Sequence, residues 1–218
     1  MDDEAKQSAF ISALTTEHFV LQTAASSNIS EAAARSSLYI LSLSSSLVAI
    51  AFMSQSPGML LPFVAAVLPV LLLLGLFTVI RLVDTSIDNM QYLVGIARIR
   101  RYYRSLAPDA TLYFSVETGR WPEAKFAPSQ GLGDFMLSFG TTATMIAFIN
   151  SVVAGVMVTL GIQALVEKSV LVAVICGVLT AIFLVMIFVK YQNWRFSKVD
   201  SAMEPPSTGP IEGVSQAR

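Results

Sequence analysis

Four long stretches without a formal charge limit what this chain can fold into. They are residues 38–54, 59–80, 141–162 and 170–189. A helix needs about 20 residues to cross the hydrocarbon core of a bilayer, and apolar runs near or above about 18 residues are typical of such helices. Across its 218 residues the chain is 54% hydrophobic and 13% charged, against about 25% charged in soluble proteins. We therefore expect an all-α, polytopic integral membrane protein whose main partner is the lipid bilayer.

Two short turns group the four stretches into two transmembrane hairpins. Pro57-Gly58 breaks the chain between the first two stretches, and Glu167-Lys168-Ser169 separates the last two. The predicted organisation has five segments: an N-terminal cytoplasmic helical segment (1–36), the first hairpin (37–80), a cytoplasmic helix and loop (81–133), the second hairpin (134–190) and a largely disordered cytoplasmic tail (191–218).

The polar segments are predicted to contain helices of their own. Apolar residues at three-and-four spacing over residues 4–25 indicate an amphipathic helix, and Asn28 to Glu31 resembles a capping box that starts the next helix. The first helix either packs on the protein's own cytoplasmic side or lies in the headgroup layer. Packing is favoured, because the segment carries a single lysine and lacks a basic polar face. The helical spacing continues past the second span to Arg98, which predicts a cytoplasmic extension of that helix.

Lysine and arginine gather on one side of this layout. Thirteen of the 14 lie before the first apolar stretch, between the second and third, or after the fourth, and the remaining one, Lys168, lies in a turn on the opposite side. Cytoplasmic loops of membrane proteins are enriched in these residues. We therefore predict a multi-pass protein of the cell inner (plasma) membrane with both termini in the cytoplasm. The net charge of -1 disfavours binding to nucleic acid.

Few residues of the chain are suited to catalysis. The sequence has one histidine, His18, and one cysteine, Cys176, which is too few for a metal cluster of these residues. It contains no glycine-rich phosphate loop and no nucleophile elbow. The four apolar stretches hold no ionisable residue of the kind that pumps and coupled transporters use. We expect a protein that is not an enzyme and needs no cofactor.

A stripe of small residues is the clearest packing signal. It repeats every fourth position in the third apolar stretch, at Ala143, Ala147, Ser151, Gly155 and Thr159. Small residues let helix backbones approach closely, and this is where helices associate in lipid. The stripe is predicted to touch another helix and to support a homo-oligomer.

Two polar features have both a structural and a functional interpretation. Asn150 lies deep in the third stretch and either makes an interhelical hydrogen bond or lines a pore; the hydrogen bond is favoured. A basic cluster follows the second stretch and consists of Arg98, Arg100, Arg101, Tyr102, Tyr103 and Arg104. It either sets the topology alone or contacts a phosphate group, an anionic lipid or a cytoplasmic partner.

Several stretches resemble an uncharacterised family of bacterial four-span integral membrane proteins. They are EHFVLQT at 17–23, RSSLY at 35–39, Arg81, IRRYY at 99–103 and ATMIA at 143–147. The resemblance covers the chain up to about residue 195 and implies no particular activity. The layout of a helix, an apolar hairpin and a further helix is also similar to small membrane effectors of bacterial defence systems, a likeness of architecture alone.

Two functions fit these patterns. The first is a non-enzymatic membrane protein that associates with itself and presents its basic cytoplasmic segment to a partner or ligand, as an effector, sensor or scaffold does. The alternative is a channel or passive transporter, including a pore-forming effector, with a pore among the hydroxyls of residues 38–54 and Asn150.

Overall fold

The computed structural model describes residues 3–107, 109, 113–114, 141–166 and 169–203. Its four long helices are α1 (Asp3–Met53), α2 (Pro57–Ser105), α5 (Thr142–Val166) and α6 (Val170–Met203). Each contains a segment long and apolar enough to cross a membrane, which confirms an all-α chain with four candidate spans. Much of the central loop and the last part of the tail lie outside the described residues. So does most of the short strand that the β-rich composition of residues 111–116 predicts.

The helix start predicted at Asn28 is wrong, because α1 runs without a break for 51 residues. The Asn28 side chain does not cap a helix; its Nδ2 donates a hydrogen bond to the backbone oxygen of Thr85 on α2, at 3.4 Å. The Glu31 carboxylate accepts hydrogen bonds from Arg35 and Arg81. Both side chains of the apparent capping box therefore serve contacts that the linear sequence does not reveal.

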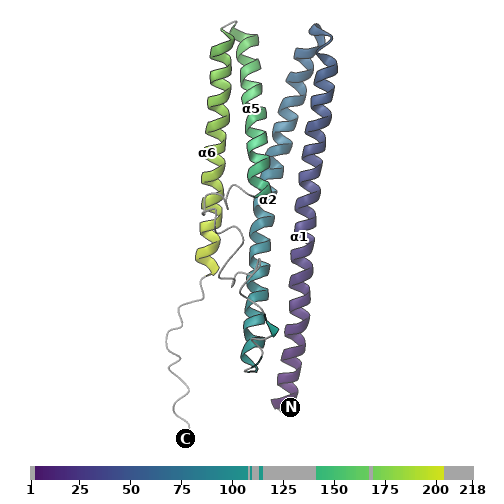
Figure 1. The fold of residues 1–218 in the computed structure, drawn as a ribbon, viewed down its shortest axis with the longest axis vertical. Helices are drawn as coiled ribbons and strands as arrows, with labels where there is room; N and C mark the ends of the chain where they lie inside the picture. The colour runs from purple at the N-terminus through teal and green to yellow at the C-terminus, as the bar shows by residue number, and fades with distance from the viewer. Residues whose placement is uncertain (1–2, 108, 110–112, 115–140, 167–168, 204–218) are drawn as a thin grey trace.

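Helices α1 and α2 lie side by side along their lengths (Figure 1). One set of α1 residues that are not exposed recurs at alternating spacings of three and four, which is the repeat of a coiled coil. In the first part of α1 this set is Ile11, Leu14, His18, Leu21, Ala25, Asn28 and Ala32. Among the many residues of α2 that are not exposed, a set with the same spacing consists of Leu71, Gly75, Thr78, Leu82, Thr85, Asn89, Tyr92, Ile96, Ile99 and Tyr103.

The pairing extends to the N-terminal part of α1. Leu21 of α1 packs closely on Gly95 of α2: a Cβ atom added to Gly95 would lie 3.0 Å from Leu21 Cδ1. At 1.5 Å per residue, α1 is about 77 Å long and α2 about 74 Å, more than twice the roughly 30 Å of a hydrocarbon core. The first half of α1 therefore packs on the second half of α2.

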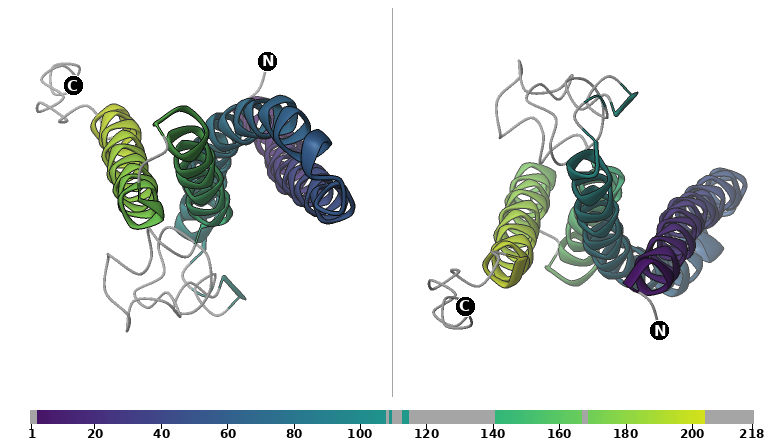
Figure 2. Two further views of the ribbon diagram at one scale, coloured as in Figure 1. Left: turned by 90° about the horizontal axis from the view of Figure 1, so that it is seen from above. Right: turned by 90° about the horizontal axis from the view of Figure 1, so that it is seen from below.

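The four helices form an open row and not a closed bundle. Its order is α1, α2, α5, α6, as Figure 2 shows, and α2 meets α6 at only a few positions. In the most apolar segment of α2 and of α5, 33% of the residues are buried. In the corresponding segments of α1 and α6, 11% are buried. A buried cluster joins α1, α2, α5 and α6 near the centre of the row; its largest members include Tyr39, Leu82, Ile146 and Phe188.

The stripe of small residues packs within the chain. Ala143, Ala147 and Ser151 are buried. A Cβ atom on Gly155 would lie 2.6 Å from the backbone oxygen of Gly177 on α6. Thr159 Oγ1 lies 3.3 Å from the backbone oxygen of Ala173 on the same helix. Gly155 and Thr159 therefore contact α6 of the same chain.

We predict that Gly155→Ala destabilises the α5–α6 pair by about 1–3 kcal/mol, because the new methyl group overpacks a backbone contact. Gly161→Ala is the matched control: it lies in the same helix, and a Cβ atom there meets nothing within 4 Å. The free energy of unfolding in mixed detergent micelles, followed by helix content, measures both. Equal effects of the two substitutions would contradict the close α5–α6 contact.

Candidate functional site

A polar layer separates the apolar part of the helix row from its polar part. Glu31 on α1 accepts hydrogen bonds from Arg81 Nε at 3.0 Å and Nη2 at 3.4 Å on α2, and from Arg35 Nε at 2.9 Å. The hydrogen bond from Arg81, followed by that from Arg35, lowers the pKa of Glu31 below its ordinary value. This carboxylate stays ionised near neutral pH and joins α1 to α2.

The same layer continues across α2, α5 and α6. Arg195 on α6 forms an ion pair with Asp84 on α2. Gln192 on α6 is buried and lies 3.2 Å from the hydroxyl of Thr144 on α5, measured from Oε1 to Oγ1. We call Glu31, Arg81, Asp84, Thr144, Gln192 and Arg195 the polar layer, since they link all four helices.

Asn150 lies on the apolar side of this layer, where it connects three helices. Its Oδ1 accepts a hydrogen bond from the hydroxyl of the fully buried Tyr39 on α1, at 3.3 Å, and its Nδ2 donates to the backbone oxygen of Leu72 on α2, at 3.4 Å. The absent side chain of Gly75 makes room, because a Cβ atom there would lie 2.2 Å from Asn150 Oδ1. Both ends of the amide are used by the protein itself.

Beyond the polar layer, residues 3–30 of α1 and 85–105 of α2 form a two-helix segment that we call the stalk. Two tyrosines of the basic cluster hold its far end together. Tyr102 meets Phe10 edge to face with ring centroids 5.5 Å apart, and the Tyr103 hydroxyl lies 3.1 Å from Thr15 Oγ1. Both tyrosines thus pack against α1, which makes them structural parts of the stalk.

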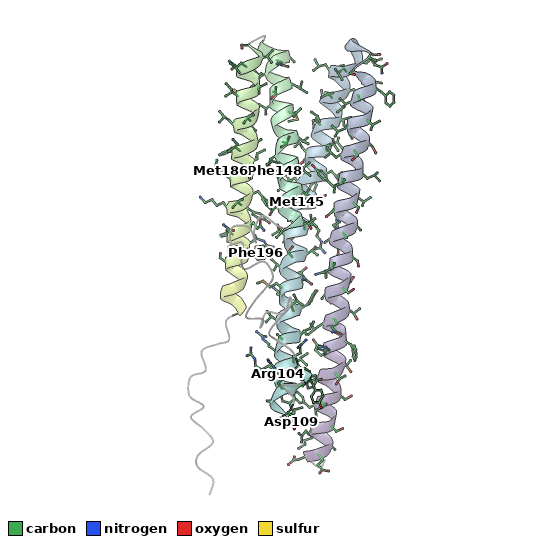
Figure 3. All side chains as sticks on the ribbon, in the orientation of Figure 1. Arg104, Asp109, Met145, Phe148, Met186 and Phe196 are labelled. Atoms are coloured by element: carbon green, nitrogen blue, oxygen red, sulfur yellow. The ribbon has the colours of Figure 1, made fainter. Side chains whose placement is uncertain are left out.

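The four arginines of the basic cluster fall on two faces of α2. Arg98 and Arg101 are exposed, whereas Arg100 and Arg104 are half-buried. Figure 3 shows Arg104 near the far end of the stalk, well away from Met145 and Phe148 in the apolar part. The predicted site therefore divides: Arg98 and Arg101 present charge to solvent, and Tyr102 and Tyr103, which follow them, hold the stalk together. We call Arg98 and Arg101 the basic tip.

His18 lies in the stalk among the residues of α1 that are not exposed. Its Nδ1 is buried and has no hydrogen-bond partner within the described part of the chain. Burial, and then the nearby charge of Arg100 on α2, lower the pKa of His18 below its ordinary value of 6.5. The folded stalk therefore favours the neutral imidazole.

The grooves between the helices in the apolar part are lined almost entirely by aliphatic and aromatic side chains. One lies between α1, α2 and α5 and includes Leu43, Leu68 and Val153. Another lies between α5 and α6 and includes Phe148 and Met186. Such surfaces suit lipid acyl chains. Among residues that the structure describes, no three His, Cys, Asp or Glu side chains gather to hold a metal ion.

Comparison with protein-family models, with curated proteins and with solved structures found no match to this chain. The resemblance to a bacterial membrane protein family, and the looser one to defence effectors, stay predictions. The stalk, the polar layer and the Asn150 contact must therefore carry the functional argument by themselves.

We predict that acidification loosens the stalk. Since the pKa of His18 is lowered on folding, the unfolded chain takes up a proton first, and stability present above about pH 6.5 is lost as the pH falls below it. The thermal midpoint of helix loss in detergent is expected to be lower at about pH 5.5 than at about pH 7.5. The variant His18→Gln should lose much of this difference. Glu31 titrates below this window, so an unchanged pH dependence in His18→Gln would contradict the assignment.

Proposed function

We propose that the chain is a membrane-anchored scaffold or effector that holds a basic tip away from the bilayer for a cytoplasmic partner. The observation that carries this proposal is the length of the α1–α2 pair. The two helices stay in contact along a distance more than twice the thickness of a hydrocarbon core. Such a pair both crosses a membrane and stands out from it.

The helix lengths support a bilayer whose edge lies at the polar layer, with α1–α2 and α5–α6 as two hairpins. The helical segment from the start of α2 to Arg81 is about 36 Å long. The segment from Arg35 to the end of α1 is about 27 Å long, and that from the start of α6 to Lys190 about 30 Å. These values bracket the roughly 30 Å hydrocarbon core. Tyr191, Trp194 and Arg195 follow directly and suit the headgroup region.

Charge supports the orientation of the stalk. The bias of lysine and arginine places the stalk and both termini in the cytoplasm under the positive-inside rule. The stalk then extends about 36 Å from Arg81 to the end of α2. On this account the basic tip faces the cytoplasm and is held off the membrane surface.

The height of the tip favours a protein partner over the protein's own membrane lipids. Arg98 lies about 26 Å and Arg101 about 30 Å beyond Arg81 along α2, whereas charges in physiological salt are screened over about 8 Å. An upright stalk keeps these arginines away from nearby headgroups. A partner with an acidic surface fits the tip better, since arginine pairs well with carboxylates.

The channel alternative has less support. Asn150, the polar residue expected to line a pore, uses its amide to join α1, α2 and α5. Asn150 therefore has a role in holding three helices together. Hydroxyls elsewhere in the apolar helices, among them Thr78, Ser151 and Thr180, donate their hydrogen to their own helix carbonyls.

A photo-crosslinking residue at Ser105 tests the proposal in cells. Ser105 is exposed and lies at helical spacing from Arg98 and Arg101. We expect an adduct with a cytoplasmic protein, and its loss when both arginines are replaced by glutamine, because the charge attraction is removed. The same probe at Ser12, exposed on α1, is the control. An adduct with lipid, with a periplasmic protein, or one unaffected by the two substitutions would contradict the proposal.

A further inference from the structure

Helix α1 has a second face with the repeat of a coiled coil, on the side that α2 leaves open. Its residues alternate at spacings of three and four over most of the helix and are all exposed. They are Ala13, Thr16, Val20, Thr23, Ser27, Ser30, Ala34, Ser37, Leu41, Ser44 and Val48, which we call the outer seam. At 100° per residue, this seam lies about 160° around the helix from the one that packs on α2.

The composition of the outer seam is unusual for a helix surface in water. From Gln7 to Ser30 the sole residue with a formal charge is Glu17, whereas the outward positions of a two-stranded coiled coil usually carry charges. Phe19 and Val20 are 62% and 55% exposed. Lipid does not explain this, because these residues belong to the stalk, beyond the polar layer.

Three of the six hydroxyl groups on the seam donate a hydrogen bond to the helix itself. Thr16 donates to the backbone oxygen of Ser12 at 3.1 Å, Thr23 to that of Phe19 at 2.8 Å, and Ser30 to that of Ser26 at 3.1 Å. These residues therefore need no hydrogen bond from water or from a polar partner. The surface is hollowed along the seam, between side chains that include Thr16, Val20, Thr23 and Ser27. A shallow surface lined by small side chains suits close contact with another helix.

We infer that the outer seam binds the outer seam of a second copy of this chain, as two parallel α1 helices related by a two-fold axis along the membrane normal. The inference rests on the proposed function in one respect, that the bilayer holds the stalk upright. Two copies inserted in the same sense then bring each seam residue level with its equivalent, and no charge on the seam opposes contact. A soluble partner would have no such fixed register.

The available area is sufficient for a specific dimer. The seam is about 53 Å long, and one helix diameter of about 10 Å gives about 530 Å² on each copy, or about 1,060 Å² in total. Specific interfaces need about 1,000 Å². The open row also leaves α1 at one end with α2 as its main neighbour, so a second copy reaches the seam without displacing any helix.

Oxidative crosslinking of single-cysteine variants in isolated membranes tests this dimer. In a Cys176→Ala background, Thr23→Cys is compared with Gln22→Cys. The two positions are adjacent, both exposed and at the same height, but Gln22 lies about 100° around the helix, off the seam. We expect several-fold more disulfide-linked dimer from Thr23→Cys. Equal yields, or an adduct whose mass differs from twice that of the chain, would overturn the proposal.

A charge exchange on the seam controls for misfolding. Val20→Glu or Val20→Lys, each added to Thr23→Cys, is expected to abolish the dimer because like charges then face each other across the axis. Coexpression of the two should restore it as a mixed dimer, and failure to restore it counts against the seam. Neither result depends on the basic tip, so this proposal and the Ser105 crosslink can fail separately.

Discussion

The packing of α1 on α2 is the interaction on which the remaining structure depends. Both helices present non-exposed residues at alternating three-and-four spacing, so one continuous seam passes from the apolar part into the polar part. Gly95 admits Leu21, and Gly75 admits Asn150. Because the seam does not stop at the polar layer, the same α1–α2 contact continues from the apolar part into the stalk.

On the proposed topology, the polar layer sets the position of the helices relative to lipid. The pairs Glu31–Arg81 and Asp84–Arg195 are partly exposed, and ion pairs of this kind contribute little stability on their own. Their main value is positional, since moving them into the hydrocarbon core would cost several kcal/mol. On the proposed topology they hold the bilayer edge at one level on all four helices. The height of the basic tip and the register of two copies both follow from that level.

The sequence predicts the elements of this fold better than their partners. Charge-free stretches of sufficient length reveal four candidate spans, and the spacing after Arg81 reveals that α2 continues. Asn28 misleads because a local capping pattern cannot show that Thr85 on another helix receives its hydrogen bond. Gly155 marks a close helix contact, but only the fold identifies Gly177 of the same chain as the partner. In the same way, the sequence places Tyr102 and Tyr103 in a basic cluster but does not reveal their contacts with Phe10 and Thr15.

The height of α1 above the bilayer tests the central claim most directly. A fluorescent donor on Ser12→Cys, in a Cys176→Ala background reconstituted into lipid nanodiscs, reports its distance to acceptors on the headgroups by energy transfer. An upright stalk that begins at Glu31 predicts a height of about 28 Å. A donor within about 10 Å of the headgroups would mean that the N-terminal helix lies on the membrane, and the stalk would not exist.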